Sequence, residues 1–154
     1  MGKILSTSVS FGRYVLSPVE RAKELGHEIF FLKYEHAKGK EKLIDAIQDV
    51  DALIVGTEPV DKDVLKNAHK LKVIAKHGIG VDNIDLEEAQ RCGIQVVNAP
   101  GTNSTAVAEF TWTLILNLIR DTELSMSTAR SGEWNKQIGF ELYGKTLGII
   151  GFGQ

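Results

Sequence analysis

Five short apolar segments, separated by segments that we interpret as helices, recur through the first hundred residues of the chain. One of them, Ala52–Val55, is apolar throughout, which is typical of a strand buried on both faces of a parallel sheet. The alternation predicts a parallel sheet with helices on both faces. The five predicted strands are Lys3–Val9, Glu28–Lys33, Ala52–Val55, Val73–Ala75 and Ile94–Val97.

The intervening helices begin at recognisable capping residues. Ser17 is a candidate N-cap, because proline follows at the first helical position and glutamate stands three residues after the serine. Asp61 and Asp85 are candidate caps for the helices before the fourth and fifth strands. Since right-handed crossovers join parallel strands, this order predicts a doubly wound, flavodoxin-like α/β sheet of strand order 2-1-3-4-5.

Composition narrows the possible partners and compartments. The formal net charge of -2 gives no electrostatic reason to expect nucleic acid or an anionic membrane as a partner. A single cysteine, Cys92, excludes an intrachain disulfide. We find no signal-peptide pattern at the N-terminus and no apolar segment long enough to span a bilayer, so we expect a cytoplasmic protein.

The pattern changes after Pro100, where one long helix is predicted from about Thr105 to Ala129. Apolar residues cover more than one of its sides, whereas a surface helix normally shows a single apolar stripe. Two interpretations remain open: the helix is buried inside a larger domain, or it crosses between domains and meets a second subunit. The apolar residues are Val107, Ala108, Phe110, Trp112, Leu114, Ile115, Leu116, Leu118 and Ile119.

The loop after the fourth strand, residues 76–83, contains two glycines in three residues. Gly78 and Gly80 can turn several backbone N–H groups toward one point, and such a concavity binds a carboxylate or a phosphate. The alternative is a tight turn without a ligand, which the spacing alone favours slightly. His77 is the only histidine in a candidate site, and nothing near it has metal-ligand spacing, so we expect no metal.

The end of the sequence is typical of the opening of a dinucleotide site. An apolar run, Thr146–Ile150, predicts a strand, and Gly151-Phe152-Gly153 would form the phosphate-binding turn after it. By itself this glycine pair is weak evidence, because such pairs after strands often serve only as turns.

Taken together, four motifs are much more specific. Their order along the chain resembles the D-isomer-specific 2-hydroxyacid dehydrogenases, and within them most resembles the D-3-phosphoglycerate dehydrogenase group. The resemblance implies that residues 1–99 form the substrate-binding domain and that residues 100–154 begin the NAD-binding Rossmann domain. The motifs are HGIGVDNIDLEEA, GIQVVNAPGTNSTAVAE, a G-x-W connector and GKTLGIIGFGQ.

The resemblance also implies roles for particular residues. Backbone amides of Gly78, Ile79 and Gly80 would hold the carboxylate of a small anionic 2-hydroxy or 2-oxo acid, which makes us prefer the anion site to the empty turn. Matching positions place Thr57 and Lys76 in the substrate cleft. Near the bound NAD would lie Ser104, Gly151, Phe152, Gly153 and Gln154. The helix over residues 105–129 matches the family's interdomain helix, which favours a homodimer.

Two departures from the family pattern affect the expected activity. Gly56 stands where some relatives have an arginine that binds an anionic substrate. The catalytic histidine, its carboxylate partner and the substrate-binding arginine of the family all match positions beyond Gln154, so this chain contains no predicted catalytic residue. We therefore expect an N-terminal fragment of a dehydrogenase, inactive by itself. The alternative is a non-catalytic flavodoxin-like module that dimerises or binds a small anion.

Overall fold

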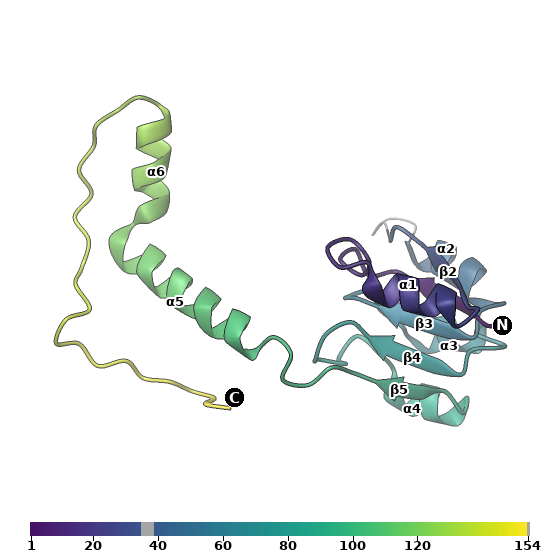
Figure 1. Cartoon of the computed structure of the whole chain (residues 1–154). Helices are drawn as coiled ribbons and strands as arrows, with labels where there is room; N and C mark the ends of the chain where they lie inside the picture. Colours follow the sequence, from purple (N-terminus) through teal and green to yellow (C-terminus); the bar gives the residue numbers. More distant parts are fainter. Residues whose placement is uncertain (35–38, 154) are drawn as a thin grey trace. The chain divides into compact units, whose positions relative to one another are not determined.

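The computed structural model describes residues 1–34 and 39–153 of the chain. The chain forms two compact units, Met1–Pro100 and Gly101–Gln154, and each is described here by itself. The first unit holds the sheet and four helices, and the second holds two helices and an extended segment (Figure 1).

All five strands of the first unit are parallel and lie in the order β2-β1-β3-β4-β5, which confirms the predicted order. The two outermost strands are therefore β2 and β5, and β3 is central. The strands are β1 (Lys3–Ser6), β2 (Glu28–Phe31), β3 (Ala52–Val55), β4 (Val73–Lys76) and β5 (Gln95–Val97).

Several strands are shorter than predicted, and the first differs most. β1 ends at Ser6, not at Val9, because the chain leaves the sheet after Thr7 donates its N–H to the carbonyl of Ile54. Val9 is then exposed. The residues after Ser6 thus form a loop at the carboxyl edge of the sheet, which becomes important for the site.

The helices of the first unit are α1 (Ser17–Glu24), α2 (Gly39–Ile47), α3 (Lys62–Lys66) and α4 (Leu86–Arg91). The predicted caps of α3 and α4 are confirmed. The Asp61 carboxylate accepts the N–H groups of Asp63 and Val64, and the Asp85 carboxylate accepts that of Glu88.

The predicted cap of α1 is wrong. The N-cap is Leu16, with no side-chain cap hydrogen bond, and Ser17 is already helical. The Leu16 carbonyl accepts the N–H groups of both Val19 and Glu20, so the backbone makes the first turn without help from the serine hydroxyl.

One face of the sheet carries the hydrophobic core. Leu53 of β3 stands opposite Leu5 of β1 and Ile74 of β4, so these side chains form a row across the sheet. Leu53 and Val55 are fully buried, whereas Ala52 and Ile54 are half-buried, so β3 is covered more completely on one face than on the other. The fully buried apolar residues that complete the core are Leu43, Ile47, Val60, Val64 and Ala89.

An ion-pair cluster joins α2 to α3. The Lys40 ammonium lies 2.7 Å from an Asp61 carboxylate oxygen and 2.8 Å from an oxygen of Asp63. Hydrogen bonds to Asp61 and then Asp63 raise the pKa of Lys40, so the lysine stays charged throughout the physiological range.

The second unit contains two helices where one was predicted. α5 (Ser104–Arg120) and α6 (Thr122–Arg130) meet at Asp121, which has φ 47° and ψ 48° in the left-handed region. A single helix over residues 105–129 is therefore wrong. Aspartate tolerates this conformation better than most residues, and its N–H still closes α5 on the Asn117 carbonyl.

The predicted strand over residues 146–150 is not formed. A strand needs a hydrogen-bonded neighbour, and no described segment pairs with these residues. Within the described part of the chain, no helix has the length and apolar character needed to cross a membrane.

Candidate functional site

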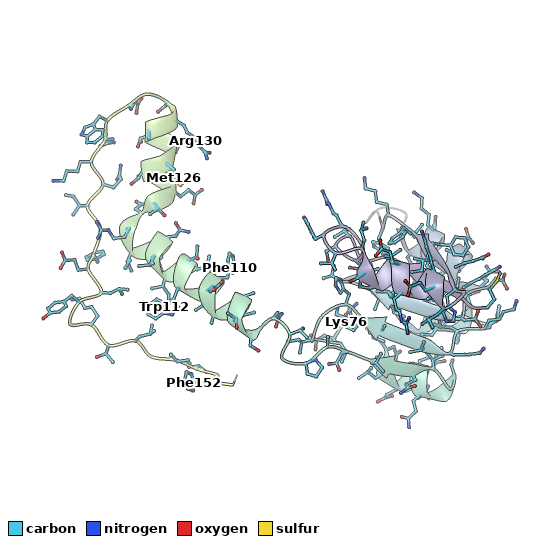
Figure 2. All side chains as sticks on the ribbon, viewed as in Figure 1. Lys76, Phe110, Trp112, Met126, Arg130 and Phe152 are labelled. Carbon is cyan, nitrogen blue, oxygen red and sulfur yellow. The ribbon has the colours of Figure 1, made fainter. Side chains whose placement is uncertain are left out.

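The candidate site lies at the edge of the sheet where the parallel strands end. Loops after β1, β3 and β4 meet there, as expected for the ligand edge of a doubly wound sheet. Lys76, the last residue of β4, marks this edge in Figure 2. Of the predicted substrate residues, Thr57, Lys76, Gly78, Ile79 and Gly80 all belong to the loops or strand end at this edge.

The glycine loop after β4 presents N–H groups and holds its carbonyls elsewhere. The Gly78 carbonyl accepts the N–H of Ala99 at 3.0 Å, and the Ile79 carbonyl accepts the Asn98 side-chain amide at 2.7 Å. No described residue accepts the N–H of Ile79 or of Gly80. The loop thus leaves two successive donors available, which is the arrangement that binds a carboxylate.

The third predicted amide of the loop is already used. The Gly78 N–H donates to the Lys76 carbonyl at 2.9 Å. Gly78 has φ 149°, a conformation that residues with side chains rarely adopt, and a Cβ there would lie 3.4 Å from Cε of Lys76. Gly78 therefore shapes the loop, while Ile79 and Gly80 carry its available donors.

Lys76 ties two loops together. Its ammonium donates to the Gly56 carbonyl and to the Asn83 side-chain oxygen, the latter at 2.8 Å. The Asn83 amide nitrogen donates in turn to the carbonyls of Glu58, at 2.6 Å, and of Gly56, at 3.2 Å. Two of the three ammonium donors are thus used inside the protein, and Lys76 offers less to a ligand than the sequence suggested.

A buried carboxylate, Glu58, fixes the loop after β3. It accepts the Gly56 N–H at 2.8 Å and the Thr7 hydroxyl at 3.1 Å, and only 7% of its surface is exposed. Thr57 stands exposed between Gly56 and Glu58, so its position follows from theirs. Sequence reasoning missed Glu58, because a glutamate before a proline in a loop gives no sign of burial.

His77 joins the loop after β1 to the glycine loop. Its Nδ1 lies 2.7 Å from Oγ of Ser8 and 3.3 Å from Oγ of Ser10. The Phe11 ring packs edge-on against the imidazole, with 5.7 Å between ring centroids. The sequence placed His77 in the site but did not predict its partners, which lie almost seventy residues earlier.

The predicted cofactor residues belong to the second unit. Ser104 is the first residue of α5, and its hydroxyl donates to the Gly101 carbonyl at 3.3 Å, so it acts locally at the start of the helix. Gly151, Phe152 and Gly153 are exposed, and Gly151 has φ 84°. Gln154 lies outside the described residues. In the described ranges, no group of three or more histidine, cysteine or acidic side chains could hold a metal ion.

Comparison with known proteins identifies the family. The family model for the D-isomer specific 2-hydroxyacid dehydrogenase, catalytic domain, matches residues 11–146. The chain therefore belongs to the D-isomer specific 2-hydroxyacid dehydrogenase family, as its motifs predicted, and the five-stranded parallel fold agrees with that of its structural neighbours.

Individual relatives carry two kinds of name. A D-3-phosphoglycerate dehydrogenase from Methanocaldococcus jannaschii is 49% identical over 75% of this chain and 22% of the relative. A glyoxylate reductase from Thermococcus gammatolerans is 42% identical over 75% of this chain and 37% of the relative. The chain thus spans about a fifth to two fifths of these relatives.

Solved structures agree with this assignment. The TT0316 protein from Thermus thermophilus matches with a TM-score of 0.79 and 29% identity, over 92% of this chain and 46% of that one. A cofactor (NAD+)-bound 3-phosphoglycerate dehydrogenase from Entamoeba histolytica matches with a TM-score of 0.70 and 29% identity, over 92% and 43%.

Proposed function

We propose that the chain supplies the substrate-binding part, residues 1–99, and the start of the NAD-binding part, residues 100–154, of an NAD-dependent D-2-hydroxyacid dehydrogenase. Such an enzyme, similar to D-3-phosphoglycerate dehydrogenase, interconverts a D-2-hydroxy acid and its 2-oxo acid by hydride transfer. The observation that carries the proposal is the pair of available N–H groups at Ile79 and Gly80.

These two donors suit the carboxylate that every substrate of this class shares. Hydrogen bonds to a charged acceptor contribute about 1.5–3 kcal/mol each when donor and acceptor are well aligned. Asn98 and Ala99 donate hydrogen bonds to the carbonyls of Ile79 and Gly78. Because these bonds hold the loop, the N–H donors are fixed before the ligand binds. Preorganised donors avoid the entropic cost of ordering a loop on binding.

Gly56 receives a structural explanation within this proposal. A Cβ at this position would lie 3.0 Å from Oε2 of Glu58, the oxygen that accepts the Gly56 N–H. Glycine at position 56 thus leaves room for the Glu58 carboxylate to accept the backbone N–H of this residue. An arginine here would displace Glu58, so a second charge on the substrate would need a different partner.

The proposed cofactor is NAD, held by Ser104, Gly151, Phe152, Gly153 and Gln154. The positive φ of Gly151 is a conformation that the tight turn of a pyrophosphate-binding loop also uses. NAD would supply the hydride acceptor. We expect weak or no NAD binding by residues 1–154 alone.

The proposal predicts that a 2-oxo acid binds at the glycine loop. Titration of residues 1–154 with glyoxylate should shift the amide NMR signals of Ile79 and Gly80. Gly78→Ala should weaken binding about tenfold or more, because its φ of 149° strains any residue with a side chain. Gly26→Ala is the matched control, since it places a side chain at a positive φ of 77° outside the loop, with no described atom within 4 Å.

Glyoxylate binding with no response at Ile79 and Gly80 would contradict the proposal. Inactivity of residues 1–154 alone is a separate expectation, and hydride transfer from a D-2-hydroxy acid to NAD, followed by absorbance of NADH, would overturn it. We expect no turnover, because the described neighbours of His77 are hydroxyls and an aromatic ring, without the carboxylate that orients a general base.

We also propose that the chain forms a homodimer through residues 105–129. α5 has no buried residue, and it carries a dense set of exposed apolar side chains, two of which are labelled in Figure 2. Exposed apolar side chains in this number are typical of a helix that is covered by a partner. The exposed side chains are Val107, Phe110, Trp112, Leu114, Leu116 and Leu118.

Sedimentation tests the dimer. The chain should sediment as a dimer at micromolar concentration, and Phe110→Asp should convert it to a monomer, because a carboxylate would be buried without a partner in the interface. Thr113→Asp adds the same charge on the side of α5 that carries Glu109 and Asn117, and should leave the dimer intact. A monomer at every concentration, or equal effects of both substitutions, would refute this interface.

A further inference from the structure

The glycine loop begins with a tight turn centred on His77. The Gly78 N–H donates to the Lys76 carbonyl at 2.9 Å, which closes a three-residue turn around the histidine. The His77 N–H itself donates to the Val55 carbonyl at 2.8 Å, so the turn is fixed to the central strand β3. Only Gly78 separates His77 from the available N–H of Ile79. Any movement of the His77 backbone therefore moves this donor.

The imidazole ring of His77 is held by another segment, the loop after β1. Its Nδ1 lies 2.7 Å from Oγ of Ser8 and 3.3 Å from Oγ of Ser10. The Phe11 ring meets the imidazole at an interplanar angle of 86°. Ser8 is 7% exposed, so rotation of the imidazole away from it would leave a buried hydroxyl without this partner. The ring thus links the loop after β1 to the carboxylate donors.

The contact with Ser8 is compatible with both charge states of the imidazole. A hydroxyl can donate a hydrogen bond to a neutral ring nitrogen, and it can accept one from the N–H of a charged ring. Histidine is the side chain that ordinarily changes its charge between about pH 5 and 8. His77 is exposed, so its ring can exchange protons with the solvent. The ring can therefore stay in place while its charge changes.

The charged groups on the elements around His77 are engaged elsewhere. Arg13, in the loop after β1, lies 5.6 Å from the centroid of the Tyr14 ring. Glu58, in the loop after β3, is buried and accepts hydrogen bonds from its own loop and from the loop after β1. The Lys76 ammonium donates to the loop after β3 and to a side-chain oxygen of the glycine loop. Among the described residues, no carboxylate forms an ion pair with His77.

The remaining charge in the glycine loop, Asp82, opposes the binding of an anion. A Cβ at Gly80 would lie 3.2 Å from Oδ2 of Asp82, so this carboxylate stands beside one of the two available donors. Its negative charge weakens the attraction of the donors for a second carboxylate. A positive charge on His77 would offset this effect, because His77 lies only two residues from Ile79 in the same loop.

We propose that His77 is a positioning residue that makes carboxylate binding depend on pH. Ser8 and Ser10 hold its ring, and its backbone turn sets the position of the two N–H donors. Its positive charge, gained as the pH falls, strengthens the binding of a carboxylate there. The inference rests on the proposed function, because it concerns the regulation of the same site. It assigns no proton transfer between His77 and the substrate.

Glyoxylate titrations of residues 1–154 at several pH values test the role of the charge. Between about pH 5.5 and 8.5 the carboxyl group of the ligand stays ionised, whereas a histidine loses its proton. The affinity should be about two- to fivefold higher at the acidic end, the range expected for one exposed pair of opposite charges. Nitrogen NMR signals of the His77 ring should show that bound glyoxylate delays the loss of its proton to higher pH, because the two equilibria are linked.

His77→Asn separates the charge from the contact. The asparagine oxygen can take the place of Nδ1 beside Ser8, so the loop should keep its structure, but the residue carries no charge. The affinity should become independent of pH over this range and stay near that of the unsubstituted chain at the basic end. His69→Asn is the matched control. It removes another exposed histidine, close to the amino end of β4, and should leave the pH dependence unchanged.

Ser8→Ala tests the contact itself. Without the hydroxyl the imidazole loses its nearest partner, so the donors should be less well ordered and glyoxylate should bind about two- to fivefold more weakly at every pH. The amide signals of Ile79 and Gly80 should also move in the free protein. Ser17 is exposed on α1, and Ser17→Ala is the matched control that should change neither quantity. Unchanged affinity and unchanged amide signals in Ser8→Ala would overturn the positioning role.

The outcomes also separate this inference from the proposed function. If Ile79 and Gly80 respond to glyoxylate with the same affinity at every pH, or if His77→Asn keeps the pH dependence, the inference is wrong and the proposed function stands. If these two amides respond to no 2-oxo acid at any pH, the proposed function fails and the inference fails with it.

Discussion

Leu53→Ala is expected to lower the free energy of unfolding by about 2–5 kcal/mol, a large share of the roughly 5–15 kcal/mol that keeps a typical domain folded. Leu53 is fully buried on the central strand, opposite Leu5 on one side and Ile74 on the other. The neighbours of Leu53 in this row are strand residues, so neither a short loop nor an exposed side chain can collapse into the space that the substitution leaves. The full cavity cost should therefore remain.

Chemical denaturation followed by far-ultraviolet circular dichroism measures this effect. Leu25→Ala removes the same atoms from a side chain that is 57% exposed at the end of α1, and it should change stability by less than about 1 kcal/mol. Equal losses in the two variants would mean that Leu53 is not in the core, and would contradict the strand register.

The core could be predicted because its signals are local. Ala52–Val55 is continuously apolar, and Asp61 and Asp85 stand where a capping carboxylate belongs, so strand order and helix starts followed from neighbouring residues. Asp121 could not be predicted in this way. Its left-handed backbone divides an otherwise regular helical pattern. A single aspartate at the end of an apolar run does not indicate that a helix breaks there.

The site was predictable only in part. Two glycines in three residues indicated the anion loop, and the structure describes two available donors there. Glu58 and Asn83 acquire their roles from distant partners: Glu58 bonds Thr7 from 51 residues away, and Asn83 bonds the Glu58 carbonyl across 25 residues. No local pattern encodes such a contact, because it depends on which strands become neighbours.

Asn83→Ala is the second variant with a large expected effect. It should lower the free energy of unfolding by about 2–3 kcal/mol, because one side chain makes three hydrogen bonds here. The carbonyl of Glu58 would lose its donor, and the Lys76 ammonium would lose its side-chain acceptor. We expect the loop that carries Thr57 to exchange its amide protons faster in this variant.

The comparison variant is Asn67→Ala, which removes one exposed hydrogen bond to the Asp63 carbonyl and should cost less than about 1 kcal/mol. Denaturant unfolding and hydrogen exchange at residues 56–58 distinguish the two substitutions. Faster exchange confined to that loop, with glyoxylate binding at Ile79 retained, would show that Asn83 positions the loop after β3 independently of the carboxylate site. If Asn83→Ala left both stability and exchange unchanged, the Lys76–Asn83–Gly56 network would not hold the loop. Lys76 would then be free to meet the substrate, as its place in the sequence first suggested.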